Sequence, residues 1–220
     1  DRLQDGRGLW RGEFWGKWIL GAAAACRYSG DDVLRERIAW MVDELLATQD
    51  DDGYIGTYHD SRFGMEPGRT FEWNVWCRKY TLWGLLEAHD LLGDPKILAA
   101  ACRMMDHLAA QVGPGAFDLV RTGWASGLPS LSLLVPVVHL YRRTGEDRYL
   151  AYAHYIIDQM AALPGEPPDL LRRGLTGRPL IEWFPDDRRW AKGYELLSVC
   201  EGMLELFAVT GRGELLIVQV

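Results

Sequence analysis

An imperfect repeat of paired helical segments constrains the fold of this sequence more than any other feature. Three complete pairs and the start of a fourth share an apolar helix, a short turn and a second helix, at residues 18–46, 80–108, 131–160 and 196–216. Each turn falls at a glycine, the residue that most readily takes the left-handed conformation ending a helix. These glycines are Gly30, Gly93, Gly145 and Gly211, and acidic residues suited to a helix start follow the first three, at Asp31, Asp94 and Glu146. The repeat predicts a series of αα-hairpins.

The two helices of each hairpin differ in polarity. In the first helix apolar residues lie almost all round, as in residues 19–26 and 82–86, which predicts burial on most sides. The second helix is amphipathic, with an apolar stripe and a charged face, as in residues 34–45. Buried first helices and amphipathic second helices form two concentric layers. We therefore predict an all-α fold of αα-hairpin repeats forming part of an (α/α)6 toroid, or else a helical solenoid.

Long connections separate the hairpins. They run roughly over residues 49–72, 112–129 and 162–191, and all three precede a first helix, so they lie at the same end of the layers. Loops of this length in a compact domain are usually functional or disordered, and these contain Trp, Tyr and charged residues. We expect them to build the rim and floor of a cleft.

Composition excludes several classes of function. The net charge of -7 and the pI of about 5.3 argue against a nucleic-acid partner, because phosphate-binding surfaces are basic. The longest apolar run, residues 18–26, is too short to span a bilayer, so we expect no membrane partner. The four cysteines show neither disulfide nor zinc-site spacing, and we expect no cofactor within this chain. The start of the sequence has no basic n-region and no apolar h-region, so we expect any signal peptide to be absent or already removed; the compartment stays open, and for a soluble chain we favour the cytoplasm.

Some helix starts and loops carry side chains that suit a carbohydrate ligand. Aromatic faces stack on the C–H faces of sugars, and pairs of carboxylates cleave glycosidic bonds. The stretch GEFWGKW places Glu13 and Lys17 one turn apart around Trp15, although an ordinary i to i+4 ion pair explains this spacing equally well. In DDDGYIGTY, Gly53 and Gly56 permit a tight loop from which Tyr54 or Tyr58 can present a hydroxyl. The tryptophans can instead pack the helix ends.

A family resemblance extends in order along nearly the whole chain. It rests on five stretches: WRGEFWGKWILGAAAA, QDDDGYIGTY, WNVWCRKYTLWGLLEAHDLLGD, LYRRTGEDRYLAYA and YELLSVCEGMLELFAVTG. Together they resemble the N-terminal half of the β-L-arabinofuranosidase-like glycoside hydrolases, glycoside hydrolase family 127 and its relatives. The resemblance implies an (α/α)6 catalytic toroid, usually followed by β-sandwich domains, that acts on L-arabinofuranosides or related plant glycans. Residues 1–220 are then the N-terminal portion of one catalytic domain, apparently truncated.

The resemblance also implies which residues face the pocket. These are Glu13, Lys17, Asp52, Tyr54, Glu72, Trp73, Tyr80, Tyr194 and Glu195, to which Trp15 is added as an aromatic candidate. Some members carry His in the segments where this chain has Arg78, Lys79 and Lys192, a departure that bears on sugar specificity. In characterised members a Cys nucleophile sits with other Cys and a Glu around zinc, and a further Glu is the acid/base. No cysteine here matches those motifs, so catalytic residues stay unknown and zinc is implied only for the complete protein.

We therefore expect a glycoside hydrolase fragment that binds a carbohydrate substrate and is inactive alone. One alternative is another (α/α) toroid enzyme, of the unsaturated uronyl hydrolase, lyase or epimerase type, using the arginines of HDSRFGMEPGR and RTGW as carboxylate clamps. The other is a non-catalytic helical scaffold that binds glycan or protein. A cut toroid exposes the apolar flanks of residues 18–26 and 196–209, so we also expect self-association through this edge.

Overall fold

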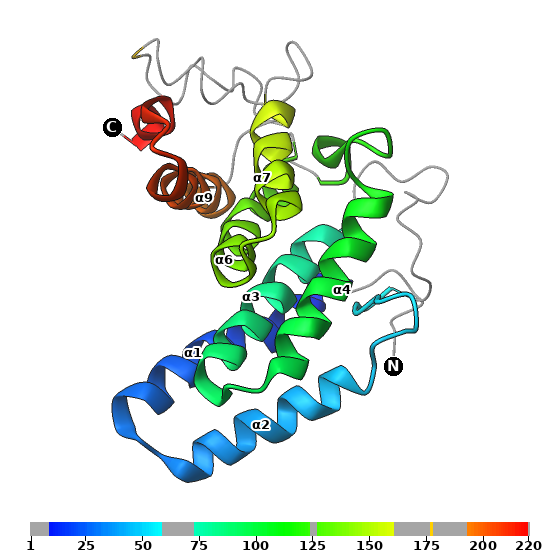
Figure 1. Ribbon diagram of the computed structural model, residues 1–220, viewed down its shortest axis with the longest axis vertical. Helices are drawn as coiled ribbons and strands as arrows, with labels where there is room; N and C mark the ends of the chain where they lie inside the picture. The colour runs from blue at the N-terminus through cyan, green and yellow to red at the C-terminus, as the bar shows by residue number, and fades with distance from the viewer. Residues whose placement is uncertain (1–8, 59–72, 124–126, 161–176, 178–192, 220) are drawn as a thin grey trace. The chain divides into compact units, whose positions relative to one another are not determined.

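The computed structural model describes residues 9–58, 73–123, 127–160, 177 and 193–219 (Figure 1). These residues form α-helices, turns and short 3₁₀ helices, with no strand among them. The α-helices are α1 (Glu13–Ser29), α2 (Asp32–Leu46), α3 (Asn74–Leu92), α4 (Pro95–Gln111), α5 (Leu128–Leu131), α6 (Leu134–Thr144), α7 (Asp147–Gln159) and α9 (Gly193–Thr210). The 3₁₀ helices are η1 (Leu9–Gly12), η2 (Leu119–Arg121) and η6 (Gly213–Gln219).

The four predicted glycine turns are confirmed. Gly30, Gly93, Gly145 and Gly211 have φ of +67°, +73°, +68° and +70°, and the N–H of each donates to the carbonyl four residues earlier at 2.7–2.8 Å. Two of the predicted acidic caps also form. Asp31 Oδ1 accepts from the Leu34 N–H at 3.0 Å, and Asp94 Oδ1 accepts from the Lys96 N–H at 2.9 Å.

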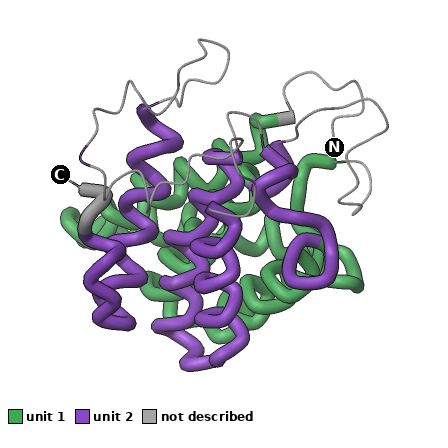
Figure 2. The backbone as a smooth tube through the Cα atoms, turned by 90° about the horizontal axis from the view of Figure 1, so that it is seen from above, with its two compact units in different colours: residues 1–63, 76–111 green, residues 64–75, 112–220 purple. Residues whose placement is uncertain are grey.

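The chain divides into two compact units (Figure 2). Unit 1 comprises residues 1–63 and 76–111 and holds α1, α2, α4 and all but the first two residues of α3. Unit 2 comprises residues 64–75 and 112–220 and holds α5, α6, α7 and α9. The expectation of a single catalytic domain stays a prediction.

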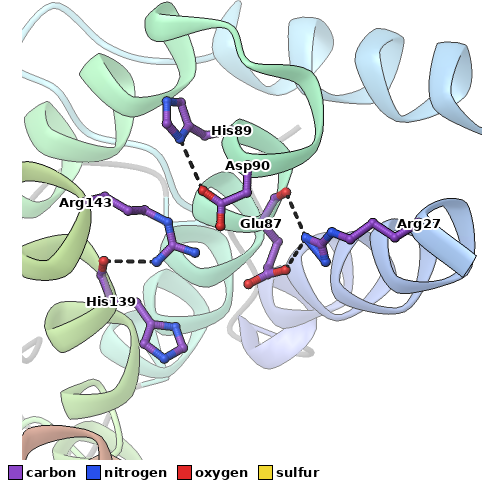
Figure 3. A network of polar contacts seen from close by, with 6 residues as sticks. All are labelled: Arg27, Glu87, His89, Asp90, His139 and Arg143. Carbon is purple, nitrogen blue, oxygen red and sulfur yellow. Dashed lines mark hydrogen bonds and ion pairs between the residues drawn. The ribbon is translucent and has the colours of Figure 1, made fainter. Parts of the chain in front are cut away.

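In unit 1, α1 and α3 cross backbone to backbone. A Cβ added to Gly16 would lie 1.9 Å from the main-chain oxygen of Tyr80, and one added to Gly84 would lie 3.0 Å from the Gly16 Cα. A larger residue at either position would hold the two helices apart. Further along the same helices, Arg27 donates to both the carboxylate and the main-chain carbonyl of Glu87 (Figure 3).

The prediction that first helices are buried on most sides is correct for α3 and α6 and wrong for α1. One face of α1 is exposed and carries Phe14, Trp18, Gly21 and Tyr28. Trp18, for example, keeps 39% of its surface accessible. The reason is that α2 and α3 cover only the opposite face, while Gly and Ala in residues 21–25 give no polar signal of exposure. In unit 2, Leu197 and Leu204 of α9 are exposed as well.

The predicted first helix of the third hairpin is split into α5 and α6. Pro136 has no N–H to donate to the Ser132 carbonyl, so the helix is interrupted at Ser132 and Leu133 and resumes at Leu134. Farther along unit 2, Gly202 of α9 packs tightly on Leu134, where an added Cβ would lie 2.8 Å from the leucine Cβ. Among the described residues, no helix has the length and apolar character needed to cross a membrane.

The long connection before α5 is packed onto α7. The Tyr152 hydroxyl donates to the Val112 carbonyl at 2.7 Å, and the Tyr155 hydroxyl accepts from the Leu119 N–H at 3.0 Å. Thr122 then donates to Ser130 at 2.8 Å, which joins the end of this connection to α5. The second predicted loop is therefore held by side chains at both of its ends.

Candidate carbohydrate site

A buried carboxylate at the start of α1 lies against α3 in unit 1. Glu13 is 8% exposed; its Oε1 lies 3.0 Å from Lys17 Nζ, and its Oε2 accepts from the Trp76 indole N–H. The predicted i to i+4 ion pair of Glu13 and Lys17 therefore forms, and the Trp76 indole binds the second oxygen of the same carboxylate. The Gly16 crossing brings the first turn of α1 close enough to α3 for this contact.

Aromatic rings of α3 surround the two lysines beside this carboxylate. Trp76 and Tyr80 meet edge to face with centroids 5.1 Å apart, and Lys17 Nζ lies 4.7 Å from the Tyr80 centroid. Lys79, which is fully buried, has its Nζ 4.8 Å from the centroids of both rings and 5.9 Å from that of Trp83. Such cation–π contacts stabilise a desolvated ammonium group. We call Glu13, Lys17, Trp76, Lys79, Tyr80 and Trp83 the Glu13 cluster.

Cys77 lies beside the Glu13 cluster and is buried. Burial, followed by the negative charge of Glu13, raises the pKa of the Cys77 thiol to about 12. In the described part of the chain, no three His, Cys, Asp or Glu side chains gather as a metal site would require. The residues present here do not fit zinc, and no step is assigned to it.

A second polar cluster in unit 1 joins the loop after α2 to α3 and α4. His107 of α4 lies between Arg78, whose Nη1 is 3.0 Å from the ring Nδ1, and Asp52, whose Oδ2 is 3.4 Å from Nε2. Tyr54 is fully buried, with the Arg78 guanidinium carbon 4.7 Å from its ring centroid. We call Asp52, Tyr54, Arg78, His107 and Gln111 the Asp52 cluster.

The other predicted site residues belong to neither cluster. Trp15 donates its indole N–H to the Met41 carbonyl at 3.3 Å and so joins α1 to α2. Trp73 precedes α3, and Tyr194 and Glu195 begin α9; all three belong to unit 2, where Tyr194 is exposed and Glu195 is buried. Glu72 lies outside the described residues.

Two sets of cluster members are absent from the site residues that the sequence predicted. Trp76, Lys79 and Trp83 had a usable signal, since a lysine within an otherwise buried helix, with aromatic residues at helical spacing, requires a partner. His107 had no such signal in the sequence, because its partners Asp52 and Arg78 are distant along the chain.

The arginine clamps of the acidic-substrate alternative gain no support. Arg121 pairs with Asp118 at 3.3 Å, and the stretch HDSRFGMEPGR lies outside the described residues from its first residue on.

Successive αα-hairpins and a buried carboxylate among lysines and aromatic rings place the chain among helical toroid domains. A family model described as β-L-arabinofuranosidase, GH127 catalytic domain, matches residues 4–178, and the chain belongs to this family. It is similar to the non-reducing end β-L-arabinofuranosidase of Bifidobacterium longum subsp. longum, with 31% identity over 148 residues. That match covers 64% of this chain and 22% of the relative.

Solved structures confirm the all-α fold. A GH127 β-arabinofuranosidase superposes with a TM-score of 0.69 at 17% identity, covering 98% of this chain and 34% of that one. A GH127 β-L-arabinofuranosidase from Geobacillus stearothermophilus T6 gives a TM-score of 0.67 at 18% identity, covering 96% and 35%. The prediction of αα-hairpins belonging to an (α/α)6 toroid is thereby confirmed. The chain spans about a third of the length of these structures.

Proposed function

We propose that this chain forms the N-terminal wall of a glycoside hydrolase that acts on L-arabinofuranosides or related plant glycans. Family membership supports the class of enzyme, and the relative from Bifidobacterium is described as a β-L-arabinofuranosidase. Within the chain, one observation carries the proposal: the Glu13 carboxylate is held by Lys17 and Trp76 beside aromatic rings.

The Glu13 cluster has the chemistry of a sugar-binding surface. Ring faces contact the C–H groups of a sugar, while ammonium and carboxylate groups exchange hydrogen bonds with its hydroxyls. Lys17 keeps 34% of its side chain exposed, so it is the member that a hydroxyl can reach directly. Lys79 lies deeper and places a second positive charge behind the same rings.

We assign the cluster to binding rather than to bond cleavage. Both oxygens of Glu13 are already engaged, by Lys17 and by the Trp76 N–H, which suits orientation of a hydroxyl better than attack on a sugar carbon. Glycosidic cleavage commonly requires two carboxyl groups across the bond, or a dedicated nucleophile. Because the chain spans about a third of its solved relatives, we propose that the cleaving groups lie elsewhere in a longer protein and that these 220 residues are inactive alone.

The test measures sugar release from an aryl β-L-arabinofuranoside and a panel of plant glycans that includes uronate-containing oligosaccharides. The 220-residue chain and the gene product with its natural continuation are assayed side by side. We expect only the longer protein to release arabinose. Turnover by the short chain would refute the assignment of cleavage elsewhere. Release of uronates alone would show that the substrates are uronate-containing oligosaccharides and not arabinofuranosides. Binding of a glycan by the longer protein without turnover would favour a non-catalytic scaffold.

A pair of variants in the longer protein tests the binding surface. Lys17→Met should raise KM for the active substrate about tenfold or more, because hydrogen bonds from a charged donor contribute roughly 1.5–3 kcal/mol. Lys96→Met is the matched control, since Lys96 is a surface lysine paired with Asp43 and Asp94. Equal KM values for the two variants would remove Lys17 from the site.

A further inference from the structure

The loop after α2 is ordered by its own polar groups and by α4. Gln49 Nε2 donates to the carbonyls of Gly53 and Ala100, at 2.9 and 3.0 Å. Asp52 Oδ1 accepts from the Tyr54 N–H at 3.1 Å, and the Tyr54 hydroxyl accepts from the Tyr58 N–H at 3.2 Å. The second oxygen of Asp52 lies 3.4 Å from His107 Nε2, and half of the Asp52 side chain is exposed.

Arg78 determines the protonation state of His107. A guanidinium group always carries its proton and can only donate hydrogen bonds. Because Arg78 Nη1 lies 3.0 Å from His107 Nδ1, this ring nitrogen must accept, and the ring is neutral with its proton on Nε2. The Nε2–H then points at Asp52 Oδ2, 3.4 Å away.

Gln111 agrees with this tautomer once its amide is assigned from the hydrogen bonding. The amide lies 3.0 Å from His107 Nε2. An amide nitrogen facing a protonated Nε2 would oppose two donors and would leave the Gln111 oxygen buried without a partner. With the oxygen facing the ring, Gln111 accepts from the same N–H as Asp52 does.

We propose that neutral His107 is a positioning residue that orients the half-exposed Asp52 carboxylate and ties residues 49–58 to α3 and α4. Its Nδ1 accepts from Arg78 of α3, and its Nε2–H donates to Asp52 in the loop and to Gln111 of α4. One ring thereby joins three segments that are distant in sequence.

We call the link that His107 makes between residues 49–58 and helices α3 and α4 the tie. Its strength depends on pH. Protonation would place an N–H on Nδ1 against the Arg78 N–H and would bring two positive charges together. Burial, followed by Arg78, lowers the pKa of His107, while Asp52 and Asp50 of the loop act in the opposite direction. Since the folded pKa lies below the unfolded value, the tie contributes fully above about pH 6.5 and is lost as the pH falls from there through the lowered pKa.

The role of the tie in sugar binding rests on the proposed function, whereas the tie itself does not. Asp52 is the exposed member of the cluster, so a ligand that reaches this loop meets its carboxylate, and His107 fixes the direction of that carboxylate. The experiment therefore has a structural arm on the loop and a kinetic arm on the longer protein.

The structural arm measures hydrogen exchange of the Tyr54 and Tyr58 amides, as protection factors, between pH 5 and 8. In the wild type we expect these protection factors to decrease as the pH is lowered below 6.5, with a slope that approaches about tenfold per pH unit. His107→Gln should flatten this profile, because a glutamine amide can accept from Arg78 and donate to Asp52 but does not titrate. His89→Gln is the control and should give the wild-type pH profile. His89 lies near the end of α3, with its Nδ1 3.4 Å from Asp90 Oδ1 (Figure 3). A flat wild-type profile, or an unchanged profile in His107→Gln, would overturn the proposal.

Two further measurements extend the test, and the first of them needs no variant. The ¹⁵N shifts of the His107 ring in the wild type should show a protonated Nε2 and an accepting Nδ1 at pH 7.5, and the opposite tautomer would overturn the proposal. In the longer protein, His107→Gln should remove the rise of KM at low pH and leave kcat within about twofold. If exchange confirms the tie while KM does not respond, the link to sugar binding fails and the tie stands.

Discussion

Replacing Gly16 by Ala tests the crossing of α1 and α3. The new Cβ would lie 1.9 Å from the Tyr80 carbonyl oxygen, and because this atom is backbone, no side-chain rotation can relieve the contact. The helices would have to part by about 1.5 Å to restore an ordinary 3.4 Å contact. Overpacking of this kind costs about 3 kcal/mol or more, of which the helix propensity of Ala returns about 1 kcal/mol. We expect a net destabilisation of about 2 kcal/mol.

Gly21→Ala in the same helix is the matched control. Nothing lies within 4 Å of a Cβ added at Gly21, so only the propensity gain remains, and stability should rise by about 0.5–1 kcal/mol. Urea unfolding followed by tryptophan fluorescence measures both variants as midpoints at a common slope. A Gly16→Ala variant that is as stable as the Gly21→Ala variant, or more stable, would refute the backbone crossing.

Three further predictions concern other parts of unit 1. Gly53→Ala should weaken the loop turn, since Gly53 has φ +96° and a new Cβ would lie 2.6 Å from the Arg103 carbonyl oxygen; unchanged amide exchange there would contradict this. Cys77 should resist alkylation at pH 8 until the chain unfolds, because with a pKa of about 12 only about one thiol in ten thousand is ionised; labelling of the folded protein, mapped by mass spectrometry, would contradict this. We propose self-association through the exposed face of α1, so Trp18→Lys should lower the apparent mass in sedimentation velocity while Val33→Lys on α2 should not.

Local chemistry explains what the sequence predicted well. Gly30 and the three later turn glycines follow helical apolar patterns and precede polar helix starts, so each signal lies within a few neighbouring residues. The Glu13–Lys17 pair is likewise local, and its one-turn spacing was enough to predict it.

Contacts between distant segments explain what the sequence did not predict. Gly16 and Gly21 occupy similar positions in one apolar stretch, yet one meets the backbone of α3 and the other faces open space. His107 bonds to residues 29 and 55 positions earlier, and no periodicity in α4 indicates either partner. The exposed face of α1 was expected only from the partial toroid that the family resemblance implies, because apolar composition alone predicts burial on most sides.

The crossing at Gly84 has a consequence for directed evolution. Because α1 and α3 meet through main-chain atoms, their register does not depend on the shapes of the rings around Lys79. A library that varies Tyr80 and Trp83 among aromatic residues, with Gly16, Gly84 and the Glu13 partner Trp76 kept fixed, should therefore retain the helix register and the aromatic contacts of the buried Lys79. The ring positions can then vary while the two glycines keep the two helices in place.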